Sequence, residues 1–106
     1  MPTFRKFEEI EAWKKACEVI RQIYTLSKSG GLSKDYSLRD QIRRASVSVI
    51  ANIAEGFGRN SEVEVQSPLY VALDQGYIEK QTFNNLYHAC SEISGMCKTL
   101  AQHLRL

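Results

Sequence analysis

Residues 41–60 read QIRRASVSVIANIAEGFGRN, and this stretch decides the fold class. It carries a double arginine, Arg43 and Arg44, and continues as a run of small and branched apolar residues. The β-branched residues within 47–53 do not alternate with polar ones and include no turn residues, so the pattern predicts a helix and not a strand. Strand signals are absent from the rest of the sequence too, which predicts an all-α protein.

The ends of this helix are predicted from the residues that flank it. Ser37 followed by Asp40 resembles a capping box, in which the serine oxygen accepts a hydrogen bond from a backbone amide of the first turn. Gly56 and Gly58 are typical of a helix C-cap and a tight turn. The helix is therefore expected over residues 38–57.

Two further helices show apolar residues at steps of three and four, the spacing of one helix face. The first is expected over residues 8–28, followed by a loop over 30–36. Its stripe consists of Ile10, Trp13, Cys17, Ile20 and Tyr24. The last helix, over residues 79–104, carries the seam Phe83, Leu86, Cys90, Ile93, Cys97, Leu100 and Leu104. A seam over three heptads is typical of a helical bundle.

The remaining helix is expected over residues 62–75, ends at Gly76 and contains Pro68. Proline in a helix interior costs about 3 kcal/mol, because it lacks the amide and crowds the preceding turn. Either Ser67 caps a fresh helix that starts at Pro68, or the helix kinks there. Short connections make neighbouring helices reverse direction. We therefore predict one domain over residues 1–106, an up-down-up-down antiparallel four-helix bundle whose third helix is short or kinked at Pro68.

Charge is distributed unevenly along the chain. The formal net charge is only +2, but residues 1–60 hold eleven basic and seven acidic side chains, and residues 61–106 hold three basic and five acidic ones. A positive half and a negative half can steer a polyanion to one face, or can pair subunits.

Cysteine usage and hydropathy indicate the compartment. The three cysteines form neither a Cys-x-x-Cys pair nor an even set, so we expect small buried thiols in a reducing compartment. Residues 1–15 contain no apolar run that could serve as a signal peptide, and no segment reaches the length of a membrane span. The sequence predicts a cytoplasmic protein without membrane contact.

The central stretch also resembles a bacterial protein family. The resemblance rests on Gln41, Ile42, Arg43, Arg44, Ala45, Ser46, Val47, Ser48, Asn52, Ile53, Ala54, Glu55, Gly56, Gly58, Arg59 and Asn60. It extends to Phe7, Ile10, Ala12, Trp13 and Ala16 at the start and to the run 64–78. Over nearly its whole length the chain thus resembles the four-helix-bundle proteins encoded within intervening sequences of 23S ribosomal RNA genes.

The resemblance implies that the chain forms a homo-oligomeric ring, which is expected to be a homopentamer. It also implies that the protein has no known enzymatic activity. Proteins related to that family include the accessory bundles of diversity-generating retroelements, which are thought to bind nucleic acid and a reverse transcriptase. A role in binding RNA or DNA is therefore an analogy at the level of the fold.

The sequence departs from that family at the start of the third helix. Members carry further helical turns between Ser61 and Glu62, and Pro68 replaces a polar helix-forming residue. The resemblance implies a deletion here, natural or engineered, unless a segment is missing from the sequence as printed. Either alternative agrees with a short third helix.

Basic residues are the candidates for a nucleic-acid site, because guanidinium forks match phosphate oxygens and stay charged. The candidates are Arg39, Arg43, Arg44 and Arg59 around the second helix, with Lys14 and Lys15 on the first. The alternative is a solvated face of salt bridges or a contact between subunits.

Asn52 and Glu55 lie on the most apolar helix and need hydrogen-bond partners if they are buried. We expect them to fix register, with Glu55 paired to Arg43 or Arg44 across subunits. No histidine or second carboxylate shares the helix face of Glu55, so no catalytic residue and no enzymatic activity are predicted.

The sequence also contains no recognisable set of metal ligands. His88 and His103 have no cysteine or carboxylate at ligand spacing, so neither a metal nor a cofactor is expected. No small-molecule substrate is inferred, and the aromatic residues at helical spacing are expected to be mostly core.

Three hypotheses follow for the function. The leading one is a non-enzymatic oligomeric bundle that binds RNA or DNA through a basic surface on the second helix. The alternative is an oligomeric scaffold or protein-interaction module without nucleic-acid binding, suggested by the apolar character of residues 47–54 on all sides. An enzyme with an unrecognised site ranks third.

Overall fold

The computed structural model describes residues 7–54 and 61–104, and the side chains of residues 11–51 and 65–96. The described ranges contain five helices and no strand, which confirms the all-α prediction. The helices are α1 (Phe7–Leu26), α2 (Gly30–Lys34), α3 (Tyr36–Ala54), α4 (Ser61–Asp74) and α5 (Lys80–Leu104). No helix within these ranges is both long and apolar enough to cross a membrane.

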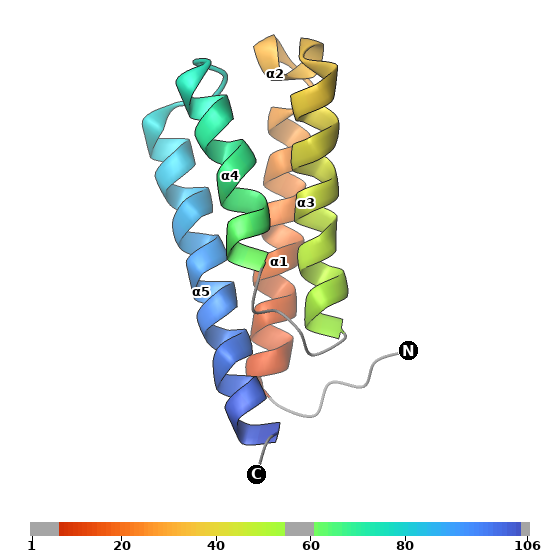
Figure 1. Ribbon diagram of the computed structural model, residues 1–106, viewed down its shortest axis with the longest axis vertical. Coiled ribbons are helices and arrows are strands. Elements are labelled where there is room, and N and C mark those ends of the chain that lie inside the picture. Colours follow the sequence, from red (N-terminus) through yellow and green to blue (C-terminus); the bar gives the residue numbers. More distant parts are fainter. Residues whose placement is uncertain (1–6, 55–60, 105–106) are drawn as a thin grey trace.

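The four long helices form the predicted antiparallel bundle. α1 packs against α3 and α5, and α4 packs against the same two helices, so α1 and α4 lie at opposite corners. Figure 1 shows the four helices running alternately up and down, with α2 at the end where α1 meets α3. The predicted loop over residues 30–36 is wrong in part, because residues 30–34 form the additional helix α2.

The core confirms the predicted seam of α5 as far as it is described. The buried members are Phe83, Leu86, Cys90 and Ile93, each 7% exposed or less. The side chains of the other three members lie outside the described residues. The core seam is therefore set by the heptad pattern on this helix.

The predicted stripe of α1 is rotated away from the core. The buried line consists of Ala12, Ala16, Val19 and Ile23. The predicted members Trp13, Cys17, Ile20 and Tyr24 are only half-buried. Small alanine side chains let the neighbouring helices approach this line, so the larger residues come to lie at the flank. The half-buried aromatic residues also correct the expectation that aromatic side chains are mostly core.

α4 continues through Pro68, which corrects the alternative of a fresh helix start at Ser67. Pro68 is buried, and this packing offsets part of the cost of its missing amide. At 1.5 Å per residue, the 14 residues of α4 reach about 21 Å and the 25 residues of α5 about 37 Å. In Figure 1, α5 extends beyond the first turn of α4, as expected for a short third helix.

The C-terminal end of α4 is fixed by a glycine cap, as predicted. Gly76 has φ +74°, and its amide donates a 3.0 Å hydrogen bond to the Leu73 carbonyl. The amide of Tyr77 reaches back to the Ala72 carbonyl at 2.9 Å. These two bonds form a Schellman motif. The motif fixes the backbone of the α4–α5 connection, from which the Tyr77 side chain extends.

The N-terminal cap of α3 differs from the predicted one. Asp35 is the capping residue, since its Oδ1 accepts a 3.2 Å hydrogen bond from the Leu38 amide, and Ser37 lies inside the helix. The Tyr77 hydroxyl donates to the other carboxylate oxygen of Asp35 at 3.1 Å. The Tyr77 ring packs on Gly31 so closely that an added Cβ would lie 2.5 Å from its Cδ1. One carboxylate thus caps α3 and joins it to the α4–α5 connection.

Candidate functional site

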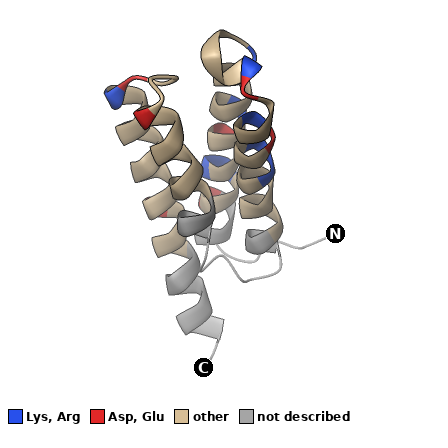
Figure 2. Ribbon diagram, turned by 45° about the horizontal axis from the view of Figure 1, so that its top comes forward, with Lys and Arg blue, Asp and Glu red and all other residues tan. Residues whose placement is uncertain are grey.

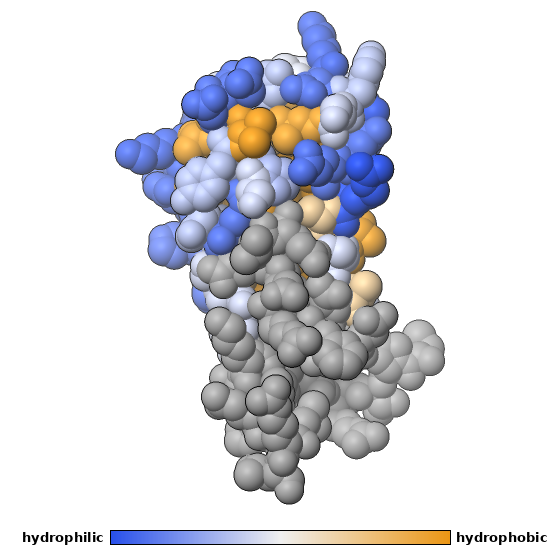
Figure 3. Space-filling view, viewed as in Figure 1, coloured by the Kyte–Doolittle hydropathy of each residue, from blue (hydrophilic) through white to orange (hydrophobic). Residues whose placement is uncertain are grey.

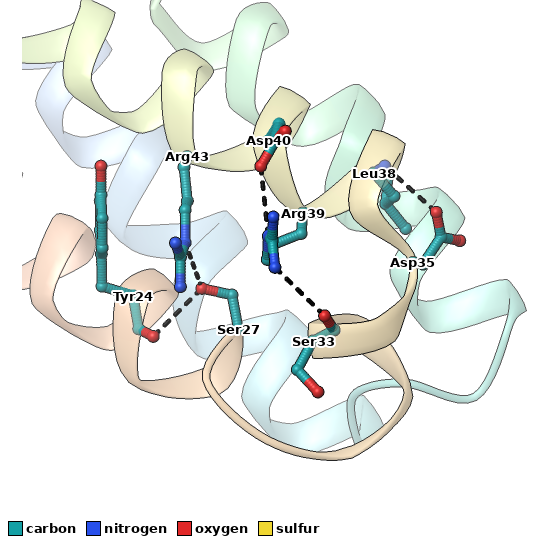
Figure 4. A network of polar contacts seen from close by, with 8 residues as sticks. All are labelled: Tyr24, Ser27, Ser33, Asp35, Leu38, Arg39, Asp40 and Arg43. Carbon is teal, nitrogen blue, oxygen red and sulfur yellow. Dashed lines mark hydrogen bonds and ion pairs between the residues drawn. The ribbon is translucent and has the colours of Figure 1, made fainter.

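Arg43 is held between α1 and α3 by two contacts. Its Nε donates a 2.7 Å hydrogen bond to Ser27 Oγ, which follows the last residue of α1. Ser27 is 1% exposed and itself donates to the Tyr24 carbonyl at 3.1 Å. The guanidinium carbon lies 4.7 Å from the centre of the Tyr24 ring, a cation–π distance. Figure 4 shows how these residues converge from the two helices.

These contacts fix the Arg43 side chain without using its whole guanidinium group. Nε is engaged, but within the described residues neither terminal nitrogen makes a hydrogen bond or ion pair. A guanidinium carries five donor hydrogens in a rigid fork. Arg43 is therefore already oriented, and its outer edge is still available to an acceptor.

Arg44 stands beside Arg43 at an open hollow on the α1–α3 side of the bundle. The hollow has a volume of about 500 Å³, and we call it the arginine groove. It is lined by Tyr24, Asp40, Arg43, Arg44, Val47, Ser48 and Ala51. Arg44 is exposed and makes no ion pair within the described part of the chain. Val47, 48% exposed, adds an apolar wall next to the two arginines.

Arg39 lies one turn before Arg43 and has a different environment. Its Nε is 3.1 Å from Asp40 Oδ1, one terminal nitrogen donates to the Ser33 carbonyl at 3.3 Å, and the group lies over the Tyr36 ring. The structure therefore ties Arg39 to α2 and to Asp40, at one end of the arginine groove (Figure 4). Its charge is partly compensated, in contrast to that of Arg44.

The two lysine candidates do not join the groove. Lys14 is paired with Glu11 on its own helix at 3.7 Å. Lys15 is paired with Glu92 of α5 at 3.1 Å and so lies towards the α1–α5 side. Exposed pairs of this kind contribute little to stability. The structure thus brings Arg43 and Arg44 together and places the lysines elsewhere.

The other predicted site residues fall outside the described residues. Arg59 and Glu55, as well as Gly56 and Gly58, belong to the undescribed segment 55–60. The backbone of Asn52 belongs to α3, but its side chain is not described. The predicted pairing of Glu55 with an arginine of another subunit therefore stays a prediction.

Charge separates the two sides of the bundle. Among the described side chains, residues 11–51 hold eight basic and four acidic groups, a net charge of +4. Residues 65–96 hold one basic and three acidic groups, a net charge of −2. Figure 2 shows that nearly all the blue segments lie on α1, α2 and α3. The arginine groove thus lies in the positive half of the molecule.

The surface also carries apolar groups outside the groove. On α4, Tyr70 is 54% exposed and Val71 47% exposed. The Tyr70 ring contacts Phe83 and Tyr87 of α5 at centroid distances of 4.9 and 5.9 Å. Figure 3 shows that hydrophobic residues also reach the surface in the upper part of that view.

Metal chemistry finds no support in the described residues. No group of three or more His, Cys, Asp or Glu side chains there could hold a metal ion. His88 is exposed on α5, and the side chain of His103 is not described. The groove itself offers one carboxylate, Asp40, which already contacts Arg39.

The sequence did not predict the partners of Arg43 or the apolar residues that line the groove. Tyr24 was assigned to an apolar stripe, and Ser27 was not singled out, because the partner of Arg43 lies on another helix. Val47 and Ala51 carry a usable signal, since they follow Arg44 by three and seven residues and so share its helix face.

The fold and the groove define an antiparallel α-helical bundle with a basic face along two of its helices. The family described as 23S rRNA-intervening sequence protein matches residues 8–99, and the chain belongs to this family. No curated protein and no solved structure matches the chain.

Proposed function

We propose that this protein is a non-enzymatic bundle that binds RNA or DNA through the arginine groove. The observation that carries the proposal is the arrangement of Arg43 and Arg44. One guanidinium is fixed by Ser27 and Tyr24 with its terminal nitrogens unused, and the second stands beside it, exposed and unpaired among the described residues. Two guanidiniums that line one hollow can each contact a phosphate oxygen of a nucleic-acid backbone.

The chemistry of the groove supports binding and not catalysis. Its serine hydroxyl, Ser48, donates to the Ala45 carbonyl at 2.7 Å, and no histidine is among the described residues that line the groove. Asp40 contacts Arg39 and has no second carboxylate beside it within the groove. A general base next to a nucleophile is the minimum for hydrolytic or transfer chemistry. Cys17 and Cys90 form no disulfide among the described residues, which supports a reducing, cytoplasmic location.

Fluorescence anisotropy with labelled RNA tests the proposal. Binding should weaken steeply between about 50 mM and about 200 mM KCl, because each neutralised phosphate contributes a slope of about −0.7 to −0.9 in log K against log salt. Arg44→Gln should lower the affinity and reduce this slope by about one phosphate contact.

Lys80→Gln is the matched control, since Lys80 is the sole basic group among the described side chains of α4 and α5 and is exposed. It should leave affinity and slope unchanged. If the wild-type protein binds neither RNA nor DNA at low salt, the proposal is wrong.

A second candidate is an oligomeric scaffold without nucleic-acid affinity. The exposed Tyr70 and Val71 and the opposite net charges of the two halves favour contact between copies of the chain. The ring assembly implied by the family resemblance belongs to this proposal. Light scattering tests the oligomeric state. A stable monomer at micromolar concentration would exclude a ring assembly, with or without nucleic-acid binding.

The double substitution Arg43→Glu and Arg44→Glu separates the two candidates. Loss of RNA binding with the oligomer intact supports the nucleic-acid role. Loss of assembly supports the scaffold, because the arginines would then serve a contact between subunits.

A further inference from the structure

The arginine groove combines charge with apolar surface along one line of α3. Arg44, Val47 and Ala51 follow each other at steps of three and four residues, and all three line the hollow. At 1.5 Å per residue, Val47 lies about 4.5 Å and Ala51 about 10.5 Å along the helix from Arg44. The groove therefore has a cationic part and an apolar part that follow each other along α3.

A negative group bounds the cationic part on the other side. Asp40 precedes Arg44 by one turn and also lines the groove. Its carboxylate disfavours a phosphate at that end and favours one between Arg43 and Arg44. The order along α3 is thus acidic, cationic and apolar, which gives a bound nucleotide a preferred direction.

The apolar part has no match in the phosphate backbone of a nucleic-acid duplex. A duplex presents phosphates to a protein surface and keeps the faces of its bases stacked inside. An unpaired nucleotide presents both a phosphate and an open base face, and proteins bind such bases on apolar, aromatic and guanidinium surfaces. Val47 and Ala51 supply an apolar surface, and Arg43 and Arg44 supply cationic groups, in one hollow of about 500 Å³.

We infer that the arginine groove binds single-stranded nucleic acid, with a phosphate on Arg43 and Arg44 and the attached base against Val47 and Ala51. This inference rests on the proposed function and specifies its ligand class. It requires binding to depend on the bases as well as on the phosphates.

Three labelled probes of equal length test the inference on the full chain: an oligothymidylate, an oligonucleotide with abasic sites at every position, and a blunt duplex. The oligothymidylate should bind several-fold more tightly than the abasic strand, because only its bases bury apolar surface against Val47 and Ala51. It should also bind more tightly than the duplex at the same salt concentration.

Val47→Ser isolates the apolar part without changing charge. It should weaken binding of the oligothymidylate several-fold and leave binding of the abasic strand unchanged. Val71→Ser is the matched control, because Val71 is 47% exposed on α4 and Val47 is 48% exposed on α3. Neither substitution removes a buried group, so both variants should stay folded, which thermal denaturation verifies.

The outcomes separate the inference from the proposed function. If the abasic strand or the duplex binds as tightly as the oligothymidylate and all binding is sensitive to salt, the single-strand inference is wrong and the nucleic-acid role stands. If none of the three probes binds, both are wrong. An equal effect of Val47→Ser and Val71→Ser would also overturn the inference.

Discussion

The α1–α3 and α4–α5 interfaces belong to one bundle but are built from different chemistry. Between α1 and α3, Arg43 reaches across to Ser27 and Tyr24, and the adjoining surface is positive. Between α4 and α5, the rings of Tyr70 and Phe83 pack beside the apolar seam, and Gln66 Nε2 donates a 3.3 Å hydrogen bond to Ser91 Oγ. The two sides differ in charge, because the arginines among the described side chains lie on α1 and α3, so a nucleic-acid site is to be sought on that side.

The largest effect on stability is expected from a cavity in the apolar seam of α5. Leu86 of α5 is 0% exposed, so Leu86→Ala should lower the free energy of unfolding by about 2 to 5 kcal/mol. Urea denaturation followed by circular dichroism measures the change. Val71→Ala, on the exposed surface of α4, is the control and should change the free energy of unfolding by no more than about 0.5 kcal/mol. A loss below that limit for Leu86→Ala would contradict the packing described for this interface.

Two buried serines, one bonded to Arg43 and one on α5, allow the effect of the Arg43–Ser27 hydrogen bond to be measured. Ser27 and Ser94 are each 1% exposed, but Ser27 Oγ is bonded to Arg43, whereas Ser94 Oγ of α5 has no hydrogen-bond partner among the described residues. Ser27→Ala should cost about 1 to 3 kcal/mol, because Arg43 Nε loses its acceptor, and should weaken RNA binding. Ser94→Ala should be neutral or stabilising and should not affect binding. Equal costs for the two substitutions would show that the Arg43–Ser27 bond has no special role.

The smallest effect concerns the contact that joins the two halves. The hydrogen bond to Asp35, with burial and the negative charge of that carboxylate, raises the pKa of Tyr77 above its usual value near 10. A raised pKa in the folded state gives a stabilisation that is complete below about pH 10 and is lost as the pH rises through the folded-state value. Melting temperatures between about pH 9 and pH 11 should therefore fall more steeply for the wild type than for Tyr77→Phe. Parallel pH profiles would rule out this contribution.

The predictability of the fold differed between helices for a physical reason. α5 repeats large apolar residues at heptad spacing, and the buried residues Leu86 and Ile93 were found directly. On α1 the large residues, such as Tyr24, were expected in the core, but the buried line runs through Ala12 and Ala16. Alanine contributes little to an apolar stripe in a sequence, yet it permits the closest approach of two helices.

The candidate site was predictable only as a set of charges. Sequence spacing placed Arg39 and Arg43 one turn apart, but it did not show that Asp40 compensates Arg39 or that Ser27 anchors Arg43. The same limit applied to Asp35, which caps α3 in place of the expected Ser37. Side-chain partners on other helices are determined by packing, which a periodic pattern does not contain.

The sequence by itself determined the all-α class, the four long helices and the membership in the 23S rRNA-intervening sequence protein family, because periodic apolar residues and the run at 41–60 are local properties of the chain. The tertiary structure alone decided which arginine is anchored and which is left exposed. Arg43 and Arg44 are neighbours in sequence, but successive helix residues point about 100° apart, so one side chain meets α1 and the other meets solvent.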